Sequence, residues 1–190
     1  MPKRPVDLEI AHRLIAGGPV AFLATRYRER TNVMALSWMT PISMNPPMVA
    51  VAVHRACLSH DFIERTGEFS LSIPGRALME QVRDAGLISG HDVDDKFEEV
   101  GLEATSGEAL SPPLVEGCLG YLECSVVEAY EAGEEHTLFL AEVVAAQVEE
   151  EAFDELWLLG DEEVKPLHHL GGHTYSQLSE AISAEPRPKE

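Results

Sequence analysis

The sequence has few cysteines and no long apolar run, and each shortage excludes a class of protein. Cys57, Cys118 and Cys124 show no CxxC spacing, so neither a zinc ribbon nor a dithiol redox pair is indicated. No segment reaches the ~20 apolar residues that span a bilayer, and the N-terminal region lacks the pattern of a signal peptide. We therefore expect a cytoplasmic protein with reduced thiols. A reactive Cys57, close to Arg55 and a helix start, is the second interpretation.

Basic residues are also scarce: the chain has 14 Lys and Arg and 33 Asp and Glu, which gives a net charge of −19. Nucleic acids and anionic membranes are therefore not expected as partners. The charge is unevenly distributed: residues 1–96 hold 11 basic and 11 acidic side chains, whereas residues 97–164 hold 19 acidic side chains and no Lys or Arg. An anionic ligand must bind mainly to the first half of the chain or to backbone amides.

Several catalytic motifs are missing. The chain contains no GxGxxG, P-loop, GxSxG or HExxH motif, which argues against a Rossmann-type dehydrogenase. His168, His169 and His173 in "HHLGGH" do not match a familiar set of metal ligands, so we predict no metal site.

What the sequence does contain is a series of short strand patterns with brief helices between them. At 190 residues with 45% hydrophobic side chains, we expect one domain over residues 1–190 with a frayed tail at 183–190. The expected strands are 20–26, 48–54 and 68–74, a hairpin of 120–131 with 136–150, and a second hairpin of 155–159 with 164–170. The expected helices are 7–16, 60–66, 77–85 and 96–100. Without a regular βαβ alternation, the fold class is mainly β, a β-barrel with short added helices.

The segment that joins the strand ending near His54 to the next helix is the first candidate site. Ser59 is expected to cap that helix, whose free amides and positive dipole end favour an anion. Arg55 adds a guanidinium suited to phosphate oxygens. The alternative is that Ser59 is only a cap and Arg55 a solvated surface residue.

Lys96 is the second candidate, because it is the last basic residue before the acidic stretch. It follows Asp92, Asp94 and Asp95, so it forms either a local salt bridge or a contact to a phosphate or cofactor.

The third candidate is the strand that contains Ser37, Trp38, Met39, Thr40 and Ser43. Its small polar side chains and free amides suit the polar edge of a ring system, although a half-buried strand with one wet face is the more common case. The small face of the next strand, with Ala50 and Ala52, also suits a flat ligand.

Six segments of the chain, taken in order, resemble the flavin reductase-like family of FMN-binding split barrels. They are "NVMALSWMTPISMNPPMVAVAV", "GEFSLSIP", "SGHDVDDKFEEVGL", "PPLVEGCLGYLEC", "GEEHTLFLAEV" and "PLHHLGGHTYSQL". No single one of these motifs is specific to the family, but their shared order and spacing over residues 17–179 are specific. The resemblance implies an FMN-binding split barrel that forms a homodimer with one FMN per subunit. One departure is "GEEH", where the family often has Gly-Asp-His.

The resemblance also implies roles for individual residues. Ser37, Trp38, Met39, Thr40 and Ser43 would line the isoalloxazine, and Arg55, Ser59 and His60 would hold the phosphate. Ser89, Gly90, Lys96 and Phe97 would close over the cofactor, with Tyr175 near the flavin and His136 contacting the nicotinamide. No side chain need act as acid or base, so no catalytic residue is predicted.

The activity that the resemblance implies is transfer of hydride from NADH or NADPH to the flavin, and then of electrons to free flavin, ferric iron or a partner. Two alternatives remain: an FMN-carrying electron-transfer protein with little NAD(P)H activity, and a non-enzymatic flavin-binding or scaffold protein.

Overall fold

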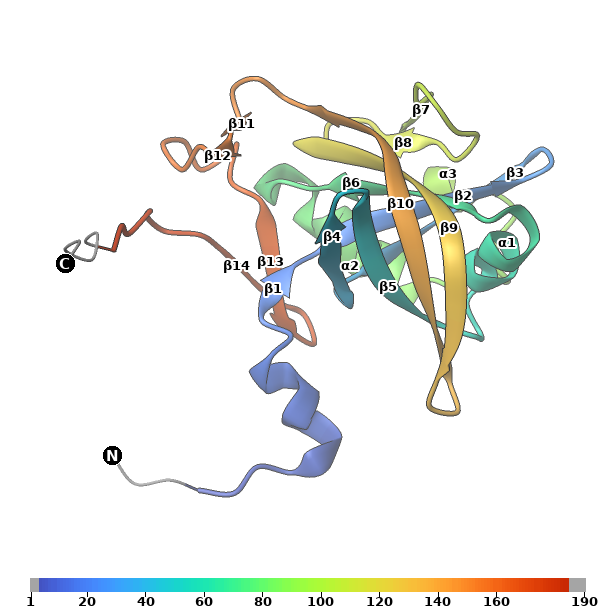
Figure 1. The fold of residues 1–190 in the computed structure, drawn as a ribbon, viewed down its shortest axis with the longest axis horizontal. Coiled ribbons are helices and arrows are strands. Elements are labelled where there is room, and N and C mark those ends of the chain that lie inside the picture. Colours follow the sequence, from blue (N-terminus) through green and yellow to red (C-terminus); the bar gives the residue numbers. More distant parts are fainter. Residues whose placement is uncertain (1–3, 185–190) are drawn as a thin grey trace.

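The computed structural model describes residues 4–184. Seven strands form one antiparallel sheet with the order β3-β2-β6-β9-β10-β5-β4 (Figure 1). The strands are β2 (Ala21–Tyr27), β3 (Arg30–Leu36), β4 (Met39–Met44), β5 (Pro47–His54), β6 (Glu68–Ile73), β9 (Gly120–Ala132) and β10 (His136–Val148). Only Ser37 and Trp38 lie between β3 and β4, the two edge strands of this sheet. Because two residues span only about 7 Å, the sheet must curl until its edges approach each other. The result is a barrel that is split between β3 and β4.

Three smaller sheets surround the barrel. The largest has the order β1-β13-β14, and the others pair β11 with β12 and β7 with β8. Their bounds are β1 (Gly18–Pro19), β7 (Ala104–Thr105), β8 (Leu114–Val115), β11 (Phe153–Asp154), β12 (Leu156–Trp157), β13 (Leu167–Gly171) and β14 (Thr174–Gln177). The predicted hairpin of residues 155–159 with 164–170 is therefore wrong: β12 pairs back onto β11, and β13 pairs with β14 and with β1 near the N-terminus.

Five short helices complete the described chain. They are the 3₁₀ helices η1 (Leu8–Leu14) and η2 (Arg76–Leu78) and the α-helices α1 (Leu58–Thr66), α2 (Met79–Leu87) and α3 (Lys96–Glu99). The α1 helix begins earlier than expected, after Cys57, and no side chain caps it, so the predicted Ser59 cap is wrong. Gly67 ends it in the left-handed conformation, with φ +69°. Across residues 4–184, no helix has the length and apolar character required to cross a bilayer. The predicted tail falls mainly on residues 185–190, outside the described residues.

The β2 strand is buried on both faces and so separates two cores. Its side chains alternate, with Leu23 in the cluster that contains Phe69 and Phe139, and Phe22 in the cluster shared with α2 and α3. In β5, the valines 49, 51 and 53 join the first of these cores. The alanines at 50 and 52 point to the opposite face.

A buried carboxylate organises the loop between β7 and β8. Glu123 of β9 is 2% exposed, and its oxygens accept hydrogen bonds from the amides of residues 108, 109 and 110 at 2.7–3.0 Å. A Cβ added at Gly107 would lie 2.5 Å from this carboxyl group, so a larger residue there would displace the carboxylate. One acidic residue of the 97–164 stretch is therefore an internal support rather than solvated surface.

We expect Glu123→Gln to lower the free energy of unfolding by about 3 kcal/mol, because the neutral amide leaves buried amide donors without an acceptor. Urea denaturation measures the loss, and amide hydrogen exchange of residues 108–110 should accelerate. The exposed Glu128→Gln on the same strand is the control. Equal stability of the two variants would contradict the supporting role of Glu123.

Candidate functional site

Three elements meet around the first turn of α1. Ser59 is fully buried, and its Oγ accepts a hydrogen bond from Asn32 Nδ2 of β3 at 2.8 Å. The buried Asn32 Oδ1 has no hydrogen-bond partner. Gly90 of the loop after α2 packs on the same asparagine, since an added Cβ would lie 2.2 Å from Asn32 Oδ1 and 3.1 Å from Leu58. The loop with Ser89 and Gly90 is thus held against β3 and α1, and this brings the predicted residues of the two segments together.

Lys96 is buried beside this turn without a carboxylate. Its side chain is 4% exposed, and its Nζ donates to the carbonyl oxygen of Ala85 at 2.8 Å. None of the ion pairs among residues 4–184 includes Lys96, so the predicted alternative of a local salt bridge is wrong. Burial lowers the pKa of Lys96 from 10.5 to about 8, and the nearby Cys57 opposes the shift. A buried ammonium with one carbonyl partner is costly unless an anion joins it.

Four aromatic rings form a chain on the side of the barrel where β5 ends and β10 begins. Trp38 stacks on His136 with ring centroids 4.9 Å apart, and His12 contacts the edge of Trp38 at 5.6 Å. His54 lies edge-on to His136 at 5.0 Å. We call His12, Trp38, His54 and His136 the ring cluster. Burial and the neighbouring His54 lower the pKa of His136, which favours its neutral form.

Arg55 connects the ring cluster to α1. Its guanidinium lies 3.4 Å from Glu131 of β9, and its amide donates to the carbonyl of Glu135 at 2.8 Å. The Glu131 side chain is largely exposed and that of Arg55 is partly exposed, so this ion pair contributes little stability and can exchange partners. Residues 54–57 therefore form a continuous path from the ring cluster to Cys57 and Lys96.

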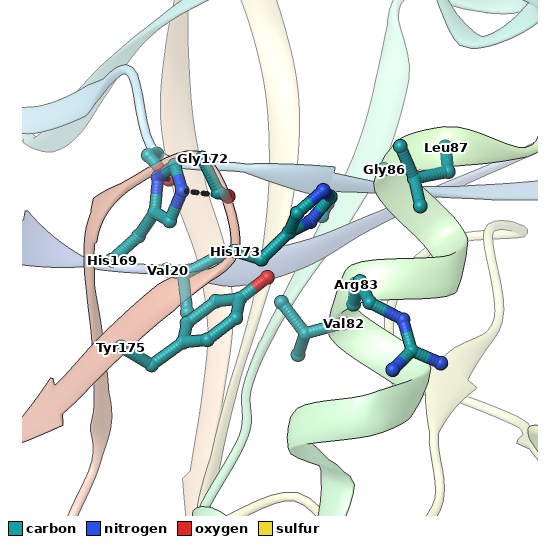
Figure 2. Close-up of a pocket in the computed structure, with 11 residues that line it drawn as sticks. Val20, Val82, Arg83, Gly86, Leu87, His169, Gly172, His173 and Tyr175 are labelled. Carbon is teal, nitrogen blue, oxygen red and sulfur yellow. Dashed lines mark hydrogen bonds between the residues drawn. The ribbon is translucent and has the colours of Figure 1, made fainter.

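A cavity of about 190 Å³ lies between α2 and the β13–β14 hairpin, and we call it the C-terminal pocket. Figure 2 shows His169, His173 and Tyr175 on one side of it and Val82 and Gly86 of α2 on the other. Its wall also includes Ser37, whose Oγ hydrogen-bonds His169 Nδ1 at 3.1 Å. Ser37 and Tyr175, which the sequence places 138 positions apart, thus line one cavity.

The other residues predicted for the site lie outside the α1 turn, the ring cluster and the C-terminal pocket, or are buried in the core. Met39 and Thr40 line a separate apolar cleft of about 670 Å³, and Ser43 lies near the end of β4. Phe97 is part of the hydrophobic core. The imidazole of His60 points into the barrel, where its Nε2 hydrogen-bonds Thr137 Oγ1 at 2.8 Å.

The sequence reasoning missed Asn32, His54 and His169. Asn32 carried no local signal, since it follows Arg30 and Thr31 in the polar first part of β3. His169 lies in "HHLGGH", which belongs to one of the family-like segments, but the resemblance implies no role for this histidine. Among residues 4–184, no group of three or more His, Cys, Asp or Glu is placed to hold a metal ion.

The arrangement is that of a split β-barrel with a polar site along its open seam, at the junction of β3, α1 and the β13–β14 hairpin. The sequence model of the protein family described as "flavin reductase like domain" matches residues 14–176 of this chain. The chain therefore belongs to the flavin reductase-like family.

Individual relatives agree with this assignment. The uncharacterized protein YddH of Escherichia coli is 34% identical over 184 residues, which cover 95% of this chain and 97% of that protein. An FMN-binding domain of a flavin reductase-like enzyme from Shewanella baltica has a similar structure, with a TM-score of 0.82, 26% identity and coverage of 95% of this chain and 96% of that one. An NADH-dependent FAD reductase of Streptomyces globisporus is 29% identical over 113 residues, 60% of each protein.

We expect Lys96→Met to stabilise the ligand-free protein by about 2 kcal/mol at pH 7, because the buried charge no longer has to be desolvated. The folded protein releases the Lys96 proton at a lower pH than the unfolded chain. Wild-type stability should therefore rise relative to the variant as the pH increases from about 8 to 10.5, and the difference should shrink. Urea denaturation at pH 7 and pH 10 in phosphate-free buffer measures both. A variant that is less stable at pH 7 would contradict this prediction.

Proposed function

We propose that the protein is an FMN-binding oxidoreductase that reduces flavin with NADH or NADPH. The observation that carries the proposal is the buried Lys96 ammonium, which has no carboxylate partner among the described residues and lies near Cys57, the residue before the first turn of α1. A phosphate group supplies the missing negative charge. The unpartnered Asn32 Oδ1 is an acceptor for a hydroxyl-bearing ligand. Both unsatisfied groups fit a phosphorylated, polyhydroxylated cofactor such as FMN.

Each part of the site has a role in holding this cofactor. Arg55, Ser59, Lys96 and the first amides of α1 would bind the phosphate. Ser37 and Trp38 at the barrel seam would lie along the ring system, with Tyr175 beside it. Ser89 and Gly90 would close the site from the loop after α2. His60 is already bonded to Thr137, so its contribution is to hold α1 on β10.

Bound FMN supplies the redox chemistry, which is the acceptance of a hydride from a reduced nicotinamide. The side chains position the reactants. His136 is held in place by its stack on Trp38, and its lowered pKa keeps it neutral, so it suits a hydrogen bond to an uncharged amide. Nearby His54 orders the turn into α1, since its Nδ1 accepts a hydrogen bond from the amide of Ala56 at 3.0 Å. No acid or base is required of either histidine.

The apolar cleft supports a homodimer as the working form. It is lined by β4, by β9 and β10, and by Phe153 and Trp157, and its walls are largely apolar. Apolar surfaces of this kind are often covered by a partner, and a second copy of the chain would also shield the β4 edge.

The purified protein is expected to be yellow, and NADH or NADPH added without oxygen should bleach its absorbance within seconds. Lys96→Met should bind FMN at least about tenfold more weakly, as measured by flavin fluorescence, because it removes a charge-assisted phosphate contact. Lys165→Met, outside the site, is the matched control.

Each alternative predicts a different result. A yellow protein that dithionite reduces but nicotinamides barely affect would be an FMN-carrying electron-transfer protein. A colourless protein that ignores added FMN would exclude both flavin functions and leave a scaffold.

His136→Ala should leave FMN affinity near that of wild type but slow the anaerobic bleaching by NADH or NADPH about tenfold or more, because the nicotinamide loses its positioning group. Stopped-flow absorbance measures the rate, and His168→Ala is the control. Loss of FMN affinity without a change in the rate for the loaded protein would place His136 in cofactor binding instead.

A further inference from the structure

The tip of the β2–β3 hairpin lies beside α1 (Figure 1). Three of the chain's few basic residues surround an open cleft of about 580 Å³ there. We call it the basic cleft and define it by its seven polar and charged lining residues: Tyr27, Arg28, Glu29, Arg30, Asp61, Arg65 and His91. Such a concentration of guanidinium groups is unexpected on a chain of net charge −19.

Two of these arginines are free to bind an anion. The guanidinium carbons of Arg28 and Arg65 each lie 5.1 Å from the centre of the Tyr27 ring. Neither arginine forms an ion pair with a carboxylate among residues 4–184. The acidic Asp61 is instead 3.9 Å from His91. Packing against Tyr27 restrains both guanidinium groups and reduces the entropy lost when a ligand binds.

The third arginine connects the basic cleft to the site described above. Arg30 donates to the carbonyl oxygens of Gly90 and Val93, each at 2.7 Å, and so fixes the loop that closes on Asn32. Leu58, the first residue of α1, lines the basic cleft, whereas its neighbour Ser59 faces Asn32. The two sites therefore share the first turn of α1 and the loop at Gly90.

We propose that the basic cleft binds the phosphate monoester of a nucleotide, held by Arg28 and Arg65. Two planar guanidinium groups match the oxygens of a phosphate, and the cleft has room for more than the phosphate alone. The Tyr27 and Phe62 rings provide apolar wall for the rest of the ligand. Two sources have this chemistry: the 2′-phosphate of NADPH, which rests on the proposed function, and a free mononucleotide, which does not.

Tyr27 provides a direct spectroscopic readout. A hydrogen bond from Arg65 and the charge of Arg28 lower its pKa, whereas burial raises the pKa of Tyr121 and Tyr175, and Glu128 raises that of Tyr130. Tyr27 is therefore expected to ionise first in an ultraviolet titration. A bound phosphate would offset the two guanidinium charges and move that first phase to higher pH.

The test titrates the whole protein with adenosine 2′,5′-bisphosphate, AMP and inorganic phosphate by calorimetry, and repeats the tyrosine titration with each. In the double variant Arg28→Gly/Arg65→Gln, affinity should fall at least about tenfold and the shift of the first tyrosine phase should vanish. Glycine is chosen because Arg28 has φ +56°, which glycine adopts without strain. Arg26→Gln, an exposed arginine outside the cleft on β2, is the control.

Steady-state rates with NADPH and NADH then identify the source. A preference for NADPH that the double variant loses assigns the site to the 2′-phosphate. Phosphate binding without such a preference assigns it to a free nucleotide. If no probe binds saturably, or if the double variant binds as well as wild type, the proposal is overturned. None of the binding measurements requires flavin, so failure of the proposed flavin function would leave this result intact.

Discussion

The two-residue link between β3 and β4 is the constraint on which the site depends. Ser37 and Trp38 must bridge the two edges of a seven-stranded sheet, which forces the sheet to curl and leaves a seam where no ladder of hydrogen bonds closes it. Polar groups gather at this seam. On one side Ser37 reaches His169 of the C-terminal hairpin, and on the other Trp38 stacks on His136 at the start of β10. Segments from both ends and the middle of the chain therefore meet where the barrel is open.

Electrostatics explains why the first half of the chain carries the site. Buried charges are costly, and Lys96 is retained beside Cys57 and α1 with only a carbonyl oxygen as its partner. A neutral side chain of similar size would avoid this cost, and the proposed contact to a phosphate offsets it. The acidic residues of the second half of the chain are mostly solvated. One of them, Glu131, forms a solvent-exposed ion pair with Arg55.

Most of the fold could be predicted from the sequence, because it depends on local patterns. The alternating side chains of β6 and the paired runs of β9 and β10 identify these strands directly. What failed was determined by contacts between distant segments. Ser59 looks like a helix cap, yet its hydroxyl bonds Asn32, 27 positions earlier. The strand that begins at Leu167 pairs with Gly18 and Pro19, and no local pattern reveals a partner near the other end of the chain.

The site was predicted in part for the same reason. Family motifs identified Ser37, Lys96 and Tyr175 as candidates, but motifs do not show direction, and Lys96 points to Ala85 rather than to the aspartates before it. Met39 follows Trp38 in the chain but lines a different cleft together with Thr40, because Trp38 belongs to the link between β3 and β4 whereas β4 begins at Met39 and pairs with β5. Predicting which neighbours share a cavity requires the curl of the sheet.

The long β9–β10 hairpin has a further consequence. Its base is buried in the core, and its β10 strand pairs with β5 as far as His136, which lies opposite His54. Beyond His136, the turn of the hairpin contacts the β5–α1 turn through the amide hydrogen bond from Arg55 to the carbonyl of Glu135 and through exposed ion pairs. Salt weakens the ion pairs but not the backbone pairing of β5 with β10. His136 is the first residue of β10 and lies at the boundary between the paired strands and this turn. Ionic strength is therefore expected to loosen residues 133–135 while the ring cluster stays attached to β5.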